Sequence, residues 1–163
     1  MSDEPLHRLK VDLTLAQASR IVDEALRAAR EHRLLPLAVA VLDAGGHLVA
    51  FKREDGAGIV RMDIAVGKAW GALGMGIPSR TVRDRLASRP AFQGAVAAAS
   101  DGRFVPVPGG VLVLDAERVV VGAVGISGDT SDKDEYCGIT GVRAAGLTPA
   151  PADPAPDWQA SAL

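Results

Sequence analysis

The sequence predicts an α+β fold: a layered sandwich with a central antiparallel sheet of about five strands flanked by helices. Apolar runs typical of strands occur in two pairs, residues 37–42 with 47–53 and residues 110–114 with 118–127. A short turn joins the members of each pair, which is the pattern of a β-hairpin. Apolar residues at helical spacing lie before, between and after these pairs. Because the strands are grouped, they should pair antiparallel and carry helices on at least one face.

Length and composition indicate a single globular domain. The chain has 163 residues, of which 48% are hydrophobic and 23% are charged, and both fractions are ordinary for a domain with its own core. The net charge of −2 and the aromatic content of 4% argue against nucleic-acid binding, for which a protein usually has a basic surface or stacking aromatics.

The sequence divides into three parts. We expect a loosely held arm over residues 1–12, a folded domain over residues 13–147, and a Pro/Ala-rich tail over residues 148–163 that is disordered or draped on the surface.

The first predicted helix begins after Thr14. Thr14 and Gln17 have the spacing of a capping box, in which each side chain satisfies a free backbone N–H of the other residue. Leu15 and Ala18 then start an apolar stripe at helical spacing. This helix should end before Pro36, because the residue before a proline disfavours the helical conformation.

Three helical segments are expected between the two hairpins. Residues 61–75 form the longest, and their many glycines and alanines indicate the close approach of another backbone. Ser79 should cap a short helix that ends at residue 86, and another short helix should end near residue 99.

The second half of the chain should add strands and a last helix. A strand over residues 102–107 would lie at a sheet edge, because Pro106 cannot donate a hydrogen bond to a neighbouring strand. After the second hairpin, Thr130 or Ser131 should cap a final helix that ends near Gly146.

Cysteine usage and the N-terminus favour a cytoplasmic protein. Cys137 is the single cysteine, so neither an internal disulfide nor a cysteine-based metal cluster can form. Residues 1–10 lack the apolar core of a signal peptide. The sequence contains no run of about 18 uncharged apolar residues, so we expect no membrane-spanning segment.

An acidic segment follows the last predicted strand. Residues 125–137 run through a glycine loop into a helix N-terminus, where free backbone N–H groups usually attract anions. Asp129, Asp132, Asp134 and Glu135 crowd this terminus, and their charge would repel a phosphate. Acids in a first turn also stabilise the helix dipole, which accounts for two of these four acids. Both a structural and a ligand-binding role therefore stay open for this segment.

Charged residues also lie in the helix predicted over residues 61–75. Arg61, Asp63 and Lys68 belong to a helix that is otherwise small and apolar. A partly buried lysine suits base chemistry or carboxylate binding. In the alternative interpretation, the stem of Lys68 lies on apolar surface while its ammonium reaches a nearby acid.

Two further places are candidates for ligand contact. His47 follows the glycine turn at residues 45–46, although a histidine in a turn is usually a solvent-exposed residue without a ligand. Phe104, with Gly109 and Gly110, either walls an apolar pocket or belongs to ordinary packing.

Several motifs in a fixed order resemble the GlcG/HbpS family, which includes haem-binding HbpS proteins and the C-terminal domain of PduO-type adenosyltransferases. The matching segments are residues 13–15, 40–48, 63–69, 107–111 and 122–128, followed by Asp134 and Glu135. They span about residues 12–146, which is nearly the whole predicted domain. The resemblance implies a profilin-like α/β/α fold and a homo-oligomer, and the small-residue helix over 61–75 would suit a packing surface.

Three functions are consistent with these observations, and whether the protein is an enzyme is left open. The first is binding of a small molecule such as haem or another tetrapyrrole. His47 is the first candidate for an axial ligand, Arg61 or Lys68 would meet the propionates, and the other candidate ligands are Met62, Met75, Tyr136 and Cys137. The second is a cofactor-independent isomerase, lyase or hydrolase acting on a small organic acid. In this function Lys68 or Arg61 holds a carboxylate, and a proton is moved by Glu135, Asp134 or His47. The third is a structural or regulatory oligomer without ligand chemistry. The candidate ligand-binding residues are Arg61, Asp63, Lys68, Phe104, Gly109, Gly110, Asp129, Thr130 and Asp134.

Overall fold

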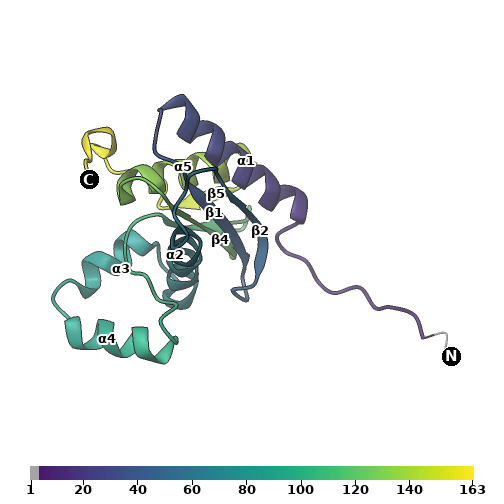
Figure 1. Ribbon diagram of the computed structural model, residues 1–163. Coiled ribbons are helices and arrows are strands. Elements are labelled where there is room, and N and C mark those ends of the chain that lie inside the picture. Colours follow the sequence, from purple (N-terminus) through teal and green to yellow (C-terminus); the bar gives the residue numbers. More distant parts are fainter. Residues whose placement is uncertain (1–3) are drawn as a thin grey trace.

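A computed structural model of the protein describes residues 4–163 and shows one sheet with helices on both faces (Figure 1). The helices are α1 (Leu15–Glu31), α2 (Arg61–Met75), α3 (Ser79–Leu86), α4 (Pro90–Ala99), α5 (Ser131–Ala144) and the short 3-10 helix η1 (Trp158–Ala160). The strands are β1 (Ala38–Asp43), β2 (Leu48–Arg53), β3 (Gly110–Leu114), β4 (Val120–Ser127) and β5 (Thr148–Ala150). Residues 4–12 are exposed and extend away from the body of the molecule.

The sheet has five strands in the order β2-β1-β4-β3-β5, and all neighbouring strands are antiparallel. This arrangement confirms the α+β class and both predicted hairpins. Strand β5 pairs with β3, with Ala150 opposite Leu112, so the first residues of the predicted tail belong to the sheet. The strand predicted over residues 102–107 is wrong, because this segment lies against α2, where the Val105 N–H donates to the Gly67 carbonyl at 3.3 Å.

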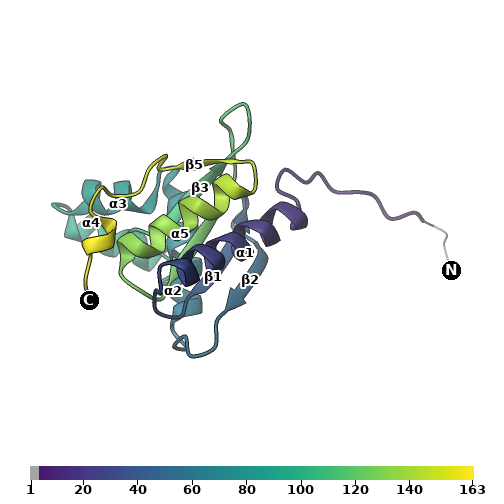
Figure 2. The same ribbon diagram turned by 90° about the horizontal axis from the view of Figure 1, so that it is seen from above.

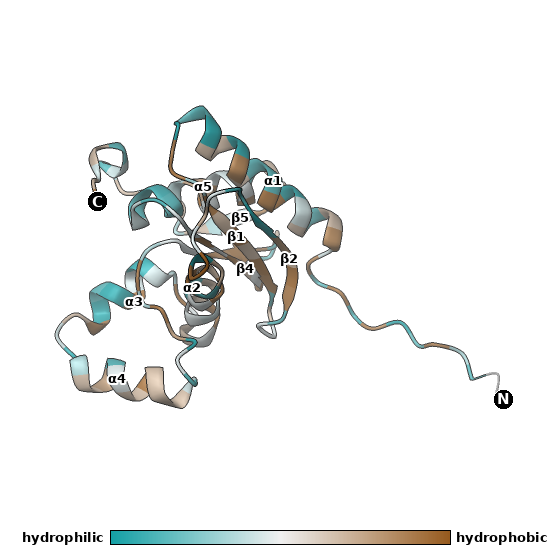
Figure 3. Ribbon diagram, viewed as in Figure 1, coloured by the Kyte–Doolittle hydropathy of each residue, from teal (hydrophilic) through white to brown (hydrophobic). Residues whose placement is uncertain are grey.

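The two faces of the sheet are packed differently. Figure 2 shows α1 and α5 side by side on one face, where Val39 and Ile126 join the main apolar core. The face toward α2 carries small residues such as Ala40. A Cβ added to Gly125 would lie 1.8 Å from the Ala65 carbonyl oxygen, so α2 can approach β4 only where the strand has no side chain. Figure 3 shows the hydrophobic strands enclosed between the helices, as this layering requires.

One of the predicted helix caps is present, and two differ from the prediction. Thr14 Oγ1 accepts the Gln17 N–H at 3.1 Å and Gln17 Oε1 accepts the Thr14 N–H at 3.0 Å, which confirms the capping box of α1. The prediction for Ser79 is wrong: Pro78 is the N-cap of α3, and the Ser79 hydroxyl binds the β3 backbone instead. Thr130 is the N-cap residue of α5, but its side chain makes no capping hydrogen bond.

The remaining helices lie at the edge of the molecule. Helix α3 contributes Val82 and Leu86 to a small apolar cluster that also contains Phe104. Helix α4 has no buried residue. Among residues 4–163, no helix is long and apolar enough to cross a membrane.

Candidate functional site

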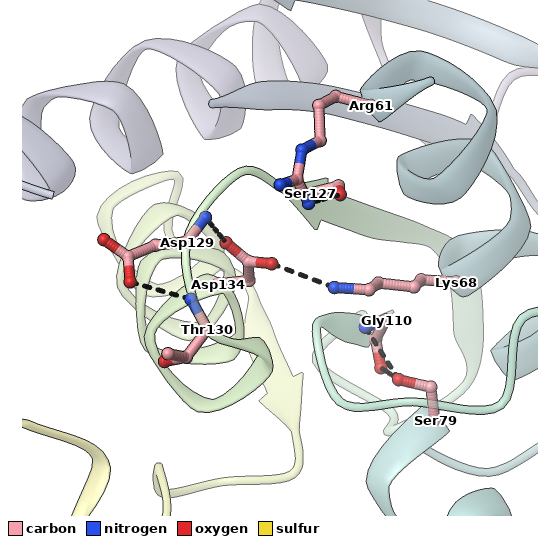
Figure 4. A network of polar contacts seen from close by, with 8 residues as sticks. All are labelled: Arg61, Lys68, Ser79, Gly110, Ser127, Asp129, Thr130 and Asp134. Atoms are coloured by element: carbon pink, nitrogen blue, oxygen red, sulfur yellow. Dashed lines mark hydrogen bonds and ion pairs between the residues drawn. The ribbon is translucent and has the colours of Figure 1, made fainter. Parts of the chain in front are cut away.

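A buried ion pair joins α2 to the start of α5. Lys68 Nζ lies 2.9 Å from Asp134 Oδ2, and the two side chains are only 3% and 1% exposed. Figure 4 shows Lys68 reaching from α2 toward Asp134 across the end of the sheet. The ammonium is therefore inside the protein, not at the surface as in the alternative interpretation, although it does meet an acid. Because the pair forms within one chain, no second subunit is needed to neutralise Lys68.

Glycines make room for Lys68. A Cβ on Gly109 would lie 3.0 Å from Lys68 Nζ, and one on Gly110 would lie 2.2 Å from the Lys68 carbonyl oxygen. Ser79 Oγ accepts the Gly110 N–H at 2.8 Å and donates to the Gly110 carbonyl at 3.2 Å, which fixes the start of β3. Gly109 and Gly110 thus serve the packing around Lys68, and Phe104, 5% exposed, packs among apolar side chains.

Two of the clustered acids hold the loop before α5. Asp134 Oδ1 accepts the Asp129 N–H at 3.1 Å, and Asp129 accepts the Thr130 N–H at 2.7 Å and the Leu35 N–H at 2.9 Å. Burial raises the pKa of Asp134, and the Lys68 ammonium opposes this rise only in part. Burial acts in the same direction on Asp129, but the backbone N–H groups of Leu35 and Thr130, together with the Lys133 ammonium, outweigh it and bring the pKa of Asp129 below the ordinary value.

Glu135 is the chemically unusual residue of the cluster. It is fully buried, and neither carboxylate oxygen has a hydrogen-bond partner. The nearest cation is Arg80, whose Nε lies 3.5 Å from Oε1 without hydrogen-bond geometry. Burial raises the pKa of Glu135 to about 7, while Arg80 and Arg83 act to lower it and Asp132 adds to the rise. A carboxyl group that titrates near neutral pH can both donate and accept a proton.

The beginning of α2 adds less to this cluster. Arg61 Nη1 lies 3.3 Å from Ser127 Oγ, at the end of β4 beside the Lys68–Asp134 pair (Figure 4). Asp63 is exposed. Cys137 is fully buried, and burial raises the pKa of its thiol far above the ordinary value, so it is not an activated nucleophile.

His47 lies at the opposite end of the sheet. In the pairing of β1 with β4, Ala38 is opposite Ser127 and Asp43 is opposite Gly122, so the hairpin after Asp43 points away from the end at which Arg61 meets Ser127. The fold therefore brings Lys68, Asp134 and Glu135 together but does not bring His47 to them. Sequence reasoning also missed Arg80, because nothing in its local pattern distinguishes it from the other arginines of α3.

His47 lies on the exposed surface of the β1–β2 hairpin. The His47 side chain is 81% exposed, and its Nδ1 lies 3.2 Å from Asp43 Oδ1. Burial acts to raise the pKa of Asp43, but hydrogen bonds from the backbone N–H groups of His47 and Gly45 bring it below the ordinary value. A hollow of about 170 Å³ beside the turn is lined by Ala44, Gly45, Gly46, Trp70, Leu73 and Gly74. The Arg103 guanidinium lies 4.8 Å from the centre of the Trp70 ring.

Comparison with known proteins agrees with this architecture. A Citrobacter freundii protein, described as an uncharacterized 15.0 kDa protein in the dhaT-dhaS intergenic region, is 29% identical over 122 residues, which cover 75% of this chain and 84% of that protein. The fold is similar to that of the PduOC:heme complex, with a TM-score of 0.75 and 24% identity over 84% of this chain and 97% of that one. It is also similar to a double mutant of Streptomyces reticuli HbpS, with a TM-score of 0.71 and 25% identity over 88% of this chain and 97% of that one.

A family model described as "Haem degrading protein HbpS-like" matches residues 13–143. This range includes the sheet strands β1 to β4 and helices α1 to α5 almost entirely. The match agrees with the motifs that resembled the GlcG/HbpS family in the sequence. The chain belongs to the HbpS-like family.

Proposed function

We propose that this protein binds a small molecule, and that the ligand is haem or another tetrapyrrole held at the β1–β2 hairpin. The observation that carries this proposal is the exposed His47 imidazole, which is paired with Asp43 and directly follows the turn that lines the hollow at Trp70. Membership of the HbpS-like family and the similarity to a haem complex support the choice of haem as the first ligand to test.

The hairpin residues fit an iron porphyrin in part. The Asp43 carboxylate lies 3.2 Å from Nδ1 of His47, and an N–H at that position would leave Nε2 as the free lone pair for a metal. A carboxylate behind a ligating histidine orients the ring and makes it more basic. Haem, when bound, supplies a redox-active iron centre. Trp70 lines the hollow beside the turn, and Arg103, which lies over one face of the Trp70 ring, offers a cation for a propionate.

One chain does not enclose such a ligand. The hollow beside the turn measures about 170 Å³, whereas cofactor pockets usually measure roughly 300–1,000 Å³. Haem would therefore lie on the hairpin surface, with its far face covered by a second copy of the chain. This geometry agrees with the homo-oligomer expected from the family resemblance, and the assembly is part of the proposal.

A haemin titration with absorption spectroscopy tests the proposal. We expect saturable, stoichiometric binding with a shifted Soret band. His47→Ala should weaken it by more than the roughly 10–100-fold that loss of an outer-shell partner costs. His7→Ala is the matched control, since His7 is exposed in the N-terminal arm. Non-saturating binding, or equal affinity of the His47→Ala variant, would reject haem binding at the hairpin.

A second function is favoured by Glu135: acid/base catalysis on a small organic acid, as in an isomerase, lyase or hydrolase. A buried carboxyl group without a hydrogen-bond partner is ready to exchange a proton with a substrate. Lys68 is occupied by Asp134, so Arg80, with a side chain that is 22% exposed, is the cation placed to hold a substrate carboxylate. His47 takes no part in this second function.

Proton exchange at carbon tests the second function. Small 2-oxo and 2-hydroxy acids are incubated with the protein in D₂O, and loss of C–H signals is followed by NMR. Glu135→Gln should abolish any exchange, whereas Glu117→Gln, in the exposed β3–β4 turn, should leave it intact. Exchange that survives in the Glu135→Gln variant would remove Glu135 from the chemistry.

A further inference from the structure

One guanidinium links the buried carboxyl group to the C-terminal segment. Arg80 Nε lies 3.5 Å from Glu135 Oε1, and Arg80 Nη2 donates a hydrogen bond to the Asp153 carbonyl oxygen at 2.9 Å. Arg80 comes from α3, Glu135 from α5 and Asp153 from the chain after β5. The arginine is therefore oriented by two groups, of which only one belongs to the site.

The C-terminal segment is itself anchored on both sides of this contact. Before it, β5 pairs with β3, and Arg143 of α5 binds Asp153 Oδ1 at 2.8 Å and also the Ala152 carbonyl. After it, Trp158 stacks on Tyr136, with ring centroids 3.7 Å apart and planes 7° apart. Figure 2 shows this yellow segment running from β5 past α3 to the start of α5.

The stacking partner of Trp158 is the residue next to Glu135. Tyr136 also shares its hydroxyl with His32 Nε2, at 3.1 Å, and the His32 ring meets Trp158 edge-on with centroids 5.0 Å apart. Trp158 is only 9% exposed. The segment is thus fixed to the same helical turn that carries Glu135, as well as to the arginine that faces Glu135.

We propose that the C-terminal segment is a positioning element for the buried acid: Asp153, held by Arg143, orients Arg80 toward Glu135. The family model matches residues 13–143, so Asp153 lies outside the matched range and Arg143 is its last residue. The proposal rests on the second candidate function, in which Arg80 and Glu135 meet the substrate. Arg80 is here the group positioned, and Asp153 and Arg143 act only through it.

The charges that face Glu135 decide what loss of this positioning would do. Arg80 and Arg83 face it from α3, Lys68 from α2 and Asp132 from its own helix. Arg80 is the strongest of the cations and favours the ionised carboxylate. If Arg80 is released from the Asp153 carbonyl, it spends less time beside Glu135, and the carboxyl group should hold its proton to higher pH.

An NMR titration of the Glu135 side-chain carboxyl carbon in the full chain tests this, and it needs no ligand. Arg80→Ala should raise the midpoint by roughly 1 pH unit, since an opposite charge at this range shifts a carboxyl by about 1–3 units. Arg143→Ala should raise it in the same direction by a smaller amount, and Asp153→Ala should reproduce that change. Added to Arg80→Ala, Arg143→Ala should have no further effect. Arg27→Ala, an exposed arginine of α1, is the control.

Three outcomes overturn the proposal: an unchanged midpoint in both Arg143→Ala and Asp153→Ala, a fall in the midpoint, or full additivity with Arg80→Ala. A fall would mean that the segment only keeps water from Glu135. If the midpoints shift as expected but no organic acid exchanges its protons, the second candidate function fails and the positioning role stands.

Discussion

The two ends of the sheet carry two kinds of polar group. At the hairpin, the His47 side chain is 81% exposed and that of Asp43 is 41% exposed, and the two pair with each other at 3.2 Å. At the other end, Lys68, Asp134 and Glu135 are almost completely buried, and the charged side chains that face one another there come from α2, α3 and α5. An exposed pair can meet a large ligand without any rearrangement. Burial can change the proton affinity of the carboxyl groups in the cluster strongly. A ligand can reach these groups only where α3 and the C-terminal segment leave room.

The difference is energetic as well as geometric. Interactions between exposed charges are weakened by water and contribute about 0–1 kcal/mol. A charge in the interior costs several kcal/mol unless it is paired. Substitutions at the hairpin should therefore change binding and leave stability almost unaltered, whereas substitutions in the cluster should change stability first.

The largest effect is expected for Lys68→Met, which keeps the apolar stem but leaves Asp134 buried without its cation. We expect the free energy of unfolding at pH 7 to fall by about 3–5 kcal/mol, as measured by urea denaturation. The matched control is Lys52→Met, because Lys52 forms an exposed ion pair with Asp23 and should cost about 0–1 kcal/mol. Equal losses in the two variants would show that the buried pair contributes no more than a surface pair.

A pH-dependent effect is expected for Glu135→Gln. In the folded protein the pKa of Glu135 is raised from 4.5 to about 7, so the folded state binds the proton more tightly than the unfolded state does. The carboxyl group therefore destabilises the fold increasingly as pH rises from about 4.5 to about 7, and by a constant amount of about 3 kcal/mol above that range.

The Glu135→Gln substitution removes this destabilisation, because the amide side chain carries no charge at any pH. The variant should match the parent protein near pH 4.5 and exceed its stability by up to about 3 kcal/mol at pH 8, measured by urea denaturation across pH. Glu117→Gln, in an exposed turn, should show no such divergence. A variant that is less stable than the parent at pH 8 would show that the Glu135–Arg80 contact outweighs the cost of burial.

The elements that local pattern determines could be predicted from the sequence. The Thr14 capping box, the helix over residues 61–75 and the strand over residues 110–114 all depend on neighbours within a few positions, and each is found with the predicted bounds. The small residues of the helix over 61–75 also predicted the close approach of another backbone, and the contact of Ala65 with Gly125 bears this out.

The errors share a physical origin in distant contacts. Residues 102–107 have a strand-like composition, but Val105 binds α2. Ser79 has the chemistry of an N-cap, but its hydroxyl is used by Gly110. The short strand β5 contains Pro149, and such a strand is recognisable only once the edge of β3 is in place.

The site divides in the same way. The acidic segment was visible as a candidate because four acids crowd one helix start, and Lys68 because a charge is unusual in a helix of small residues. Their pairing depends on how α2 crosses β3 and β4, which no local pattern records. Arg80 was missed for that reason, and the distance of His47 from Glu135 follows from the direction in which β1 runs.

A smaller effect is expected at the hairpin for Asp43→Asn. The amide keeps an oxygen for the turn but removes the negative charge behind His47, so haemin affinity should fall roughly 10-fold, at the lower end of what loss of an outer-shell carboxylate costs. The free energy of unfolding should change by less than about 0.5 kcal/mol. Asp115→Asn is the matched control, since Asp115 Oδ1 accepts the Val119 N–H at 2.8 Å in the β3–β4 turn with no histidine beside it. An equal loss of haemin affinity in both variants would mean that turn geometry, not the charge on Asp43, sets the affinity, and the contrast between the two ends of the sheet would then rest on His47 alone.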